Sequence, residues 1–143
     1  MANVISINSS EKKGEIKRPA SSGTLIKDGG LKGDAHAADG HRQLSLLAAE
    51  SIDEMTALGV EGLVPGIFAE NITTRGIVLH TLPVGTRLRI GKCLVEITQI
   101  GKQCHSGCDI FKKVGKCVMP TQGVFARVLE GGELAPGDEI EIV

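Results

Sequence analysis

The chain has few aromatic residues: of its 143 residues, three are Phe and none is Trp or Tyr. Neither sign of charge dominates, because 16 Lys and Arg oppose 17 Asp and Glu and leave a formal net charge of −1. Proteins that bind nucleic acid use a basic surface and aromatic rings on which bases stack. The composition therefore argues against nucleic acid as a partner.

Long apolar runs are also absent, and no stretch approaches the roughly 20 residues that a membrane helix needs. The first residues, MANVISINSSEKKG, contain neither the basic start nor the apolar segment of a signal peptide. We therefore expect a cytoplasmic protein with no membrane partner. The length is close to the usual size of one domain, so we predict a single domain over residues 1–143.

Nineteen glycines lie between short runs of β-branched residues, a pattern that is typical of strands joined by tight turns. Alternation of apolar and polar residues predicts strands at residues 3–8, 86–91, 93–101, 123–132 and 138–143. One amphipathic helix is predicted over residues 45–59 with Gly59 at its end, and a second short helix over 109–114. We predict a mainly β fold: a compact, mostly antiparallel β-barrel with one or two short helices.

Two segments share one pattern, LPVGTRLRI (82–90) and LAPGDEIEI (134–142), in which a turn leads into a strand. We expect the aliphatic residues of both strands, Ile140 and Ile142 included, to face inward. The outward residues have opposite charge: Arg87 and Arg89 in the first segment, Glu139 and Glu141 in the second. If the two strands are neighbours, these pairs attract across the strands by about a few tenths of a kcal/mol each.

Lysines are gathered in two places, around Lys17 in the first part of the chain and around residues 102–116. The two interpretations are a binding surface for a small anion and solvated side chains that keep the protein soluble.

The segment LKGDAHAADGHRQLSLL (31–47) is unusually dense in charged and histidine side chains. His36 and His41 could ligate a metal, but their spacing fits no standard zinc motif. The plain alternative is that the carboxylates cap turns and the histidines bind buried carbonyl groups. A third interpretation is an anion pocket, in which Lys32, Arg42 and backbone N–H groups beside glycines bind a phosphate or a similar group.

In PGIFAENITTRG (65–76), the carboxylate of Glu70 and the amide of Asn71 can form hydrogen bonds with the edge of a heterocycle. A strand that begins at Asn71 after a turn explains the same residues equally well.

The stretch GKQCHSGC (101–108) holds two of the four cysteines. In a reducing cytosol we expect free thiols. Redox pairs usually have two residues between the cysteines, whereas three separate Cys104 from Cys108. A structural zinc site could use Cys104, His105, Cys108 and Cys117, although adjacent residues rarely ligate one ion and a second Cys-x-x-Cys is absent.

A single activated thiol fits this stretch better. Cys104 follows a predicted strand and precedes a predicted helix, whose N-terminus favours negative charge. Its neighbours Lys102 and His105 also favour the thiolate. Such a thiolate can carry a persulfide sulfur or bind a soft metal such as molybdenum. Cys93 lies on an alternating strand and is expected to be a small buried hydrophobic residue.

Five ordered blocks, KGDAHAADGHRQLSLLA, GIFAENITTRGI, LPVGTRLRIG, ITQIGKQC and GVFARVLEGGELAPGDEI, resemble a stand-alone bacterial MOSC domain. This module is named from the C-terminal part of molybdenum cofactor sulfurases. The resemblance runs from about residue 20 to the end. It implies a compact MOSC-type β-barrel that binds or acts on molybdenum cofactor (molybdenum-molybdopterin), a pterin with a dithiolene and a phosphate, and it places the family's marked cysteine at Cys104.

The resemblance implies a pocket that draws on Lys32, His36, Arg42, Asn71, Lys102 and His105 around Cys104. The sequence leaves open whether Cys108 is a resolving thiol for a persulfide on Cys104. In one family chemistry the cysteine passes persulfide sulfur to molybdenum. In the other it ligates molybdenum, and the centre reduces N-hydroxylated compounds. A carrier or chaperone without chemistry is a further alternative.

The larger proteins of the family contain parts that this chain lacks. We expect no pyridoxal phosphate in it, because residues 1–143 show no resemblance to the aminotransferase domain that binds this group. Sulfur transfer then needs a cysteine desulfurase or another sulfur donor, and a molybdoenzyme as acceptor. Reduction instead needs a separate electron-donor protein. The sequence leaves open whether the chain works as a monomer or as a homodimer.

Overall fold

The computed structural model describes residues 2–10, 16–34, 43–59, 61–101 and 122–143. The regular elements are, in chain order, β1 (Ala2–Ser9), β2 (Arg18–Ala20), β3 (Gly23–Ile26), β4 (Gly30–Leu31), β5 (Leu44–Ala48), α1 (Ala49–Ala57), β6 (Ile72–Arg75), the 3-10 helix η1 (Leu79–Thr81), β7 (Arg87–Ile90), β8 (Cys93–Ile100), β9 (Val124–Glu130), β10 (Gly132–Leu134) and β11 (Glu139–Ile142). Strands form most of this regular structure, as predicted.

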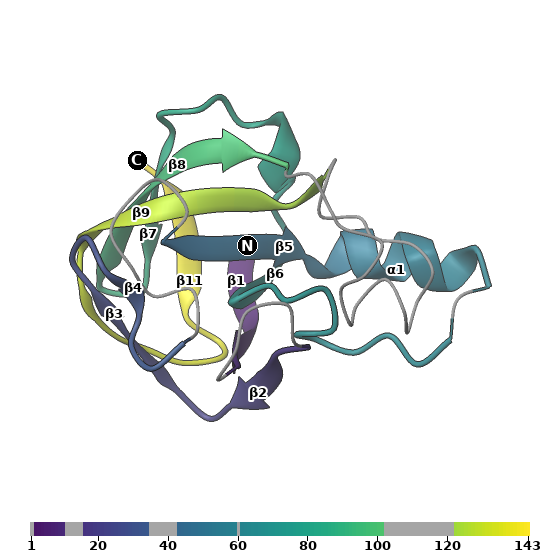
Figure 1. The fold of residues 1–143 in the computed structure, drawn as a ribbon. Helices are drawn as coiled ribbons and strands as arrows, with labels where there is room; N and C mark the ends of the chain where they lie inside the picture. The colour runs from purple at the N-terminus through teal and green to yellow at the C-terminus, as the bar shows by residue number, and fades with distance from the viewer. Residues whose placement is uncertain (1, 11–15, 35–42, 60, 102–121) are drawn as a thin grey trace.

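Seven strands close into a barrel in the order β1–β11–β7–β8–β9–β5–β6 and back to β1 (Figure 1). All neighbouring pairs in it are antiparallel except β5 and β6, which are parallel. Strand β2 pairs with β1, and β3, β4 and β10 form a separate small sheet. The mostly antiparallel barrel that the sequence predicts is therefore confirmed.

The strands predicted from alternation are present as β1, β7, β8, β9 and β11, with small shifts at their ends. The two segments of shared pattern are indeed neighbours, because β7 pairs with β11 and Arg89 lies opposite Glu141. The Arg89 guanidinium forms its ion pair with Glu130, at 3.3 Å. The inward position predicted for Ile142 is wrong. This side chain is 57 % exposed, because it is the last residue of β11, at the rim of the barrel.

The predicted helix over residues 45–59 is wrong in its first part, where the chain forms β5 and α1 starts only afterwards. Every residue of β5 is buried, with Leu46 in the barrel core and Leu47 in a second cluster outside the barrel. A strand that is buried on both faces shows no alternation, so its sequence cannot be distinguished from that of a buried helix. Gly59, with φ +96°, follows the helix end as predicted.

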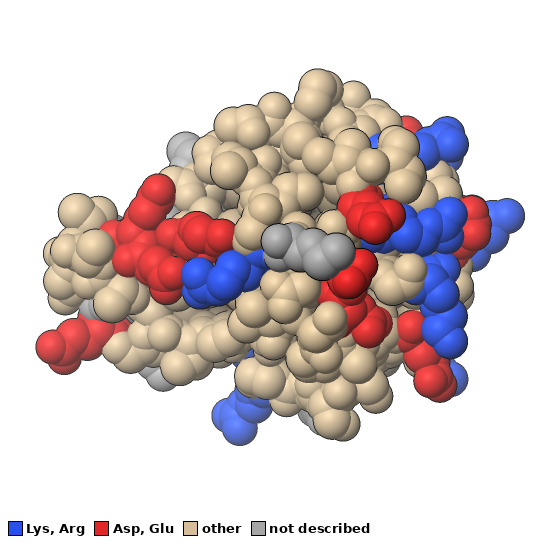
Figure 2. Space-filling model, turned by 180° about the vertical axis from the view of Figure 1, so that it is seen from behind, with Lys and Arg blue, Asp and Glu red and all other residues tan. Residues whose placement is uncertain are grey.

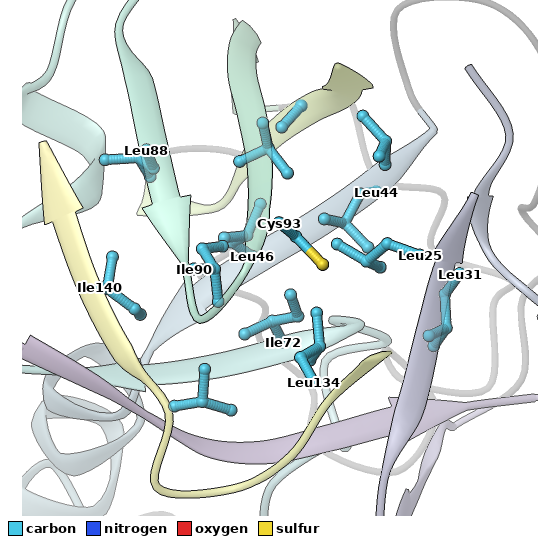
Figure 3. Close-up of a cluster of buried hydrophobic side chains, with 14 of the residues drawn as sticks. Leu25, Leu31, Leu44, Leu46, Ile72, Leu88, Ile90, Cys93, Leu134 and Ile140 are labelled. Carbon is cyan, nitrogen blue, oxygen red and sulfur yellow. The ribbon is translucent and has the colours of Figure 1, made fainter. Parts of the chain in front are cut away.

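The interior of the barrel is filled by aliphatic side chains, among them Leu44, Leu46, Ile72, Leu88, Ile90 and Ile140 (Figure 3). Cys93 lies among them with 0 % exposure, and its thiol donates to the carbonyl oxygen of Gly132 at 3.4 Å. Burial raises the pKa of this thiol. The prediction of a buried, hydrophobic Cys93 is confirmed, and its environment disfavours a reactive thiolate.

Outside the barrel, α1 and the loop at residues 64–70 cover β5 through a second apolar cluster that contains Leu47, Ile52, Met55, Ile67, Phe68 and Phe125. The opposite side of α1 exposes Glu50, Asp53 and Glu54. Figure 2 shows acidic side chains gathered at this end of the molecule. Within the described residues, α1 and every other helix are too short to cross a membrane.

Candidate functional site

The structure describes two of the predicted site residues, Lys32 and Asn71. The other six, His36, Arg42, Lys102, Cys104, His105 and Cys108, lie outside the described residues, as do Cys117 and the predicted helix over 109–114. Their assignments stay predictions. Among the residues that the structure describes, His, Cys, Asp and Glu form no group that could hold a metal ion.

The two segments that carry these predicted residues join the barrel at neighbouring strands. Segment 35–42 follows Asp34 and leads into β5, and segment 102–121 connects β8 to β9. Strand β9 is an antiparallel neighbour of both β8 and β5. The N–H of Gly101 donates to the carbonyl oxygen of Gly123 at 2.6 Å. The described residues on the two sides of segment 102–121 are therefore adjacent at this place. Val124, the first residue of β9, pairs with Leu46, which lies two residues along β5 from Leu44, or about 7 Å at 3.4 Å per residue.

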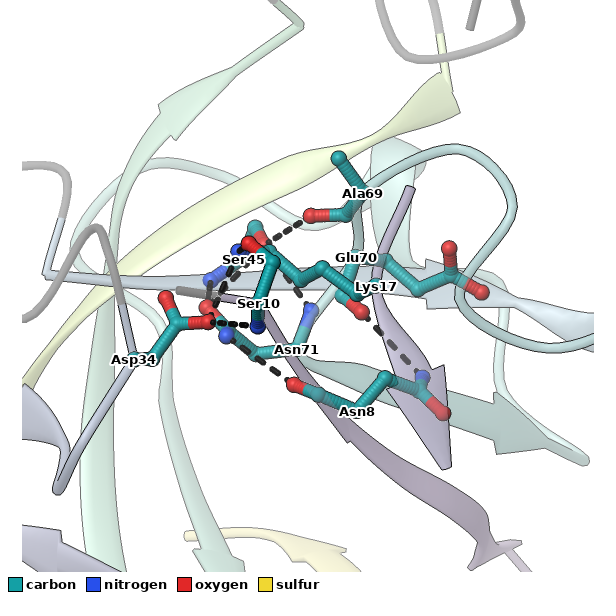
Figure 4. A network of polar contacts seen from close by, with 8 residues as sticks. All are labelled: Asn8, Ser10, Lys17, Asp34, Ser45, Ala69, Glu70 and Asn71. Carbon is teal, nitrogen blue, oxygen red and sulfur yellow. Dashed lines mark hydrogen bonds and ion pairs between the residues drawn. The ribbon is translucent and has the colours of Figure 1, made fainter. Parts of the chain in front are cut away.

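A buried polar network lies on the outer wall of the barrel, where β1, β5 and β6 meet (Figure 4). The side chain of Asn71 is at its centre and is fully buried. Its Oδ1 accepts from the N–H of Ser45 at 3.0 Å and from the Ser45 hydroxyl at 3.1 Å, and its Nδ2 donates to the carbonyl oxygen of Asn8 at 3.3 Å. Asn71 therefore holds the start of β5 against β1.

Glu70 is a second member of this network, with 0 % exposure. Its Oε2 accepts from the N–H of Gly66 at 3.0 Å and from the hydroxyl of Thr73 at 2.7 Å, and its Oε1 accepts from the N–H of Phe68 at 3.2 Å. Desolvation by burial raises the pKa of Glu70, and these hydrogen bonds oppose the rise. The carboxyl group thus ties the loop at residues 64–70 to β6 with donors that carry no charge.

The loop owes its shape to two residues with positive φ, Gly66 at +92° and Ala69 at +64°. Ala69 is strained in this conformation, because its Cβ approaches the following carbonyl oxygen. A Cβ at Gly66 would lie 2.3 Å from the carbonyl oxygen of Lys17, so only glycine fits there. This geometry turns Glu70 back toward its own loop.

Lys17 and Asp34 form a buried ion pair beside this network. The Nζ of Lys17 lies 2.8 Å from Oδ1 of Asp34, and the two side chains are 0 % and 1 % exposed. Lys17 also donates to the hydroxyl of Ser10 at 3.1 Å, and the N–H of Ser10 donates to Asp34 Oδ1 at 3.0 Å. Both sequence interpretations of the early lysines place them at the surface, and for Lys17 they are wrong. Nothing local in EIKRPA marks it as buried, since its partners come from the fold.

Lys32 lies just after β4, and its N–H donates to the carbonyl oxygen of Thr24 at 2.9 Å. Its side chain is exposed and forms no ion pair with any residue that the structure describes. The ammonium group is therefore accessible to an anion. Asn71 is buried below the surface, so the structure does not place these two predicted residues in one open pocket.

An open hollow of about 490 Å³ lies at the end of α1, lined by Thr56, Gly59, Glu61, Gly62, Leu63 and Val64. It contains neither Lys32 nor Asn71. The buried polar network instead lies beside segment 35–42, because Ser45, three residues after this segment, is bound by Asn71.

A model of the MOSC domain matches residues 32–141. The protein YflK of Bacillus subtilis (strain 168) is 25 % identical over 142 residues, which are 91 % of this chain and 63 % of YflK. This chain therefore spans less than two thirds of the length of YflK.

Two solved structures have the same fold. The YuaD protein of Bacillus subtilis has a TM-score of 0.82 at 17 % identity, with 99 % of this chain and 96 % of YuaD covered. YiiM of Geobacillus stearothermophilus has a TM-score of 0.74 at 19 % identity, with 100 % of this chain and 75 % of YiiM covered. The barrel agrees with these folds, and the family match extends over most of the sequence. The chain belongs to the MOSC domain family, which is associated with the C-terminal domain of molybdenum cofactor sulfurases.

Proposed function

We propose that this protein binds molybdenum cofactor and passes sulfur to it through Cys104. The observation that carries the proposal is the family match over residues 32–141, which includes Cys104, four positions after the last residue of β8 in the sequence. The state of Cys93 supports it, because this thiol is enclosed in the barrel and its pKa is raised by burial. A sulfur-carrying thiol must be accessible and must ionise readily.

The residues of this chain fit an anionic cofactor. Lys32 presents an exposed ammonium group at the start of the segment that carries His36 and Arg42. These three residues would hold the phosphate of the pterin, because cationic donors bind phosphate strongly. Asn71 would support them through Ser45, at the other end of the same segment. Lys102 and His105 are the neighbours of Cys104 that favour its thiolate.

When bound, the cofactor supplies a molybdenum centre that accepts a sulfur ligand. The work of the chain is to deliver that sulfur. The Cys104 thiolate attacks the outer sulfur of a persulfide on a donor, the sulfur–sulfur bond of the donor breaks, and the donor thiolate leaves. Cys104 then carries one additional sulfur atom as a persulfide. A cysteine desulfurase fits the role of donor and a molybdoenzyme the role of acceptor. Cys108 is the thiol that can resolve the persulfide: its thiolate attacks the inner sulfur on Cys104, the sulfur–sulfur bond breaks, hydrosulfide leaves and a Cys104–Cys108 disulfide forms.

The test compares the same substitution at two thiols, Cys104→Ser and Cys93→Ser. Each variant and the wild type are incubated anaerobically with a cysteine desulfurase and cysteine, and their intact masses are measured. We expect the wild type and Cys93→Ser to gain one sulfur atom and Cys104→Ser to gain none. Serine keeps a donor for the carbonyl oxygen of Gly132, so Cys93→Ser is a matched control for folding.

Equal gain in both variants, or no gain in the wild type, contradicts sulfur transfer through Cys104. Metal and pterin analysis of protein purified anaerobically from a molybdenum-replete host separates the alternatives. Retained pterin without sulfur gain favours the carrier, or the reductase if hydroxylamines are also reduced. Zinc alone favours the structural zinc site.

A further inference from the structure

The open hollow at the end of α1 has apolar side chains in its wall and at its rim. Leu63 and Val64 line it, and Val64 is 55 % exposed. Leu58, which stands between the lining residues Thr56 and Gly59, is 72 % exposed. Single exposed apolar side chains are ordinary, whereas several around one hollow are typical of a surface that a partner covers.

The chain around this hollow carries acids and no bases. Residues 43–74 contain five Asp or Glu and no Lys or Arg. Four of these acids are exposed: Glu50, Asp53 and Glu54 on α1, and Glu61 in the lining of the hollow. Figure 2 shows acidic side chains gathered at this end of the molecule.

Little in the described part of the chain compensates these charges. Arg75 lies 3.2 Å from Asp53, but both side chains are exposed, and such pairs contribute little. Glu54 accepts from the side-chain amide of Gln122 at 3.1 Å, which is a neutral donor. The other exposed acids form no ion pair with any residue that the structure describes.

The end of α1 adds to the negative potential at the hollow. The last carbonyl groups of a helix carry partial negative charge, which Lys or Arg in the last turn usually offsets. The last turn of α1 has no basic residue and contains Glu54. Because Glu54 precedes the exposed Leu58 by four positions, the two side chains lie on one side of α1. An acidic rim and an apolar surface therefore meet at the hollow.

We propose that this hollow docks a partner protein through a basic segment, in which an apolar side chain fills the hollow and flanking Lys or Arg side chains meet Glu54 and Glu61. Charge complementarity selects this occupant, because cations of the partner offset both the acids and the end of the helix. A second copy of this chain fits less well, since it brings a like-charged rim to the contact. Binding at this surface needs no cofactor.

The test locates a basic probe on the protein. The probe is a short synthetic peptide in which Leu-Phe stands between two pairs of lysines. It is titrated into isotope-labelled protein without cofactor, and shifts of the amide signals in NMR spectra show where it binds. We expect the signals of Thr56, Gly59 and Gly62 to move most and that of Ala126, inside the barrel wall, to stay. The same peptide with glutamates in place of its lysines should cause no shifts.

Matched variants separate the charge at the hollow from the charge of the whole protein. Glu54→Gln/Glu61→Gln and Glu133→Gln/Glu141→Gln change the net charge equally, and the second pair of acids is exposed on β10 and β11. We expect the first variant to bind the lysine peptide about tenfold more weakly and the second to stay within about twofold of the wild type. Leu58→Ser should also weaken binding, by about tenfold, because it removes apolar contact area. The Tm of each variant checks its folding.

Absence of shifts at the hollow in the wild type overturns the proposal, and this result does not depend on how the variants fold. Equal weakening by the two charge variants also overturns it, because the peptide then responds only to net charge. Equal binding of the glutamate peptide shows a purely apolar contact and excludes a basic partner. If the signals of Thr56 and Gly62 move when the protein alone is concentrated, and sedimentation shows a dimer, the occupant is a second copy and the proposal is wrong.

Discussion

Glu70 is a buried acid whose contacts are backbone N–H groups and the hydroxyl of Thr73. Burial raises its pKa above the ordinary value of 4.5, so the folded state keeps its proton at pH values where the unfolded chain has lost it. Stability from this residue is therefore highest below about pH 4.5 and decreases as the pH rises through the folded-state pKa. Above that pKa the buried charge exerts its full destabilising effect.

Glu70→Gln removes this titration, because an amide has no proton to release in this range. The difference in unfolding free energy between wild type and variant should change with pH above 4.5, in the direction that disfavours the wild type. The slope can approach about 1.4 kcal/mol per pH unit. Urea unfolding at a series of pH values measures it, with the exposed Glu61→Gln as control. A constant difference from pH 4.5 to 8 would contradict the raised pKa.

For single residues, the sequence predicted the buried environment of Cys93 but missed the burial of Lys17 and Glu70. Cys93 was predictable, because alternation in its own strand shows which residues face the core. The ion pair of Lys17 with Asp34 was not, because a pairing between distant residues leaves no local pattern. Glu70 stands between the apolar run GIFA and a predicted strand, and a single acid in such a place is a signal that could have identified a buried carboxyl.

Among the elements, the loop at residues 64–70 depends on the backbone of Gly66. Gly66→Ala should lower the free energy of unfolding by about 2–5 kcal/mol, because a positive φ costs about 1–2 kcal/mol and the overlap with the carbonyl oxygen of Lys17 adds about 1–3 kcal/mol. The matched control is Gly62→Ala. Its φ is also positive, at +76°, but a Cβ there meets nothing within 4 Å, so it should cost only about 1–2 kcal/mol.

Urea unfolding of both variants measures the two costs and separates backbone strain from steric overlap. Equal costs would mean that the loop moves away from Lys17 without penalty. In that case the contact of Gly66 with Lys17 does not hold the loop in place.

The elements differ in how far their sequences predict them. Strands with one face to solvent, such as β7 and β8, alternate in polarity and were predicted nearly to their ends. Strand β5 lies between the barrel core and the layer of α1, so both of its faces are apolar. For this reason its run LSLLA was predicted, wrongly, to form the start of a helix. Neighbouring elements, which the local sequence does not contain, decide between the two structures.

For the whole molecule, closure of the barrel brings the first and the last strand together. Strands β1 and β11 pair at Ala2 with Ile140 and at Asn3 with Glu139, whereas β8 and β9 pair from Leu94 with Glu130 to Ile100 with Val124. The shared pattern of residues 82–90 and 134–142 had already placed β7 and β11 as possible neighbours. The pairing of β1 with β11 leaves no comparable signal in the sequence.

The short pairing of β1 with β11 should be the place where the barrel opens first. The amides of Val4 and Ile140 should exchange hydrogen at least about tenfold faster than that of Ala126, which lies in β9 between two partners, a difference of about 1.4 kcal/mol in opening free energy. Native-state hydrogen exchange, measured by NMR at increasing urea concentrations, tests this difference in exchange rate. Ile140→Val should accelerate the exchange of the Val4 and Ile140 amides more than that of the Ala126 amide. The control Ile97→Val, inside β8, should not accelerate the Val4 and Ile140 amides more than the Ala126 amide. If Val4, Ile140 and Ala126 exchange at one rate with one urea dependence, the barrel opens only by global unfolding and this prediction is wrong.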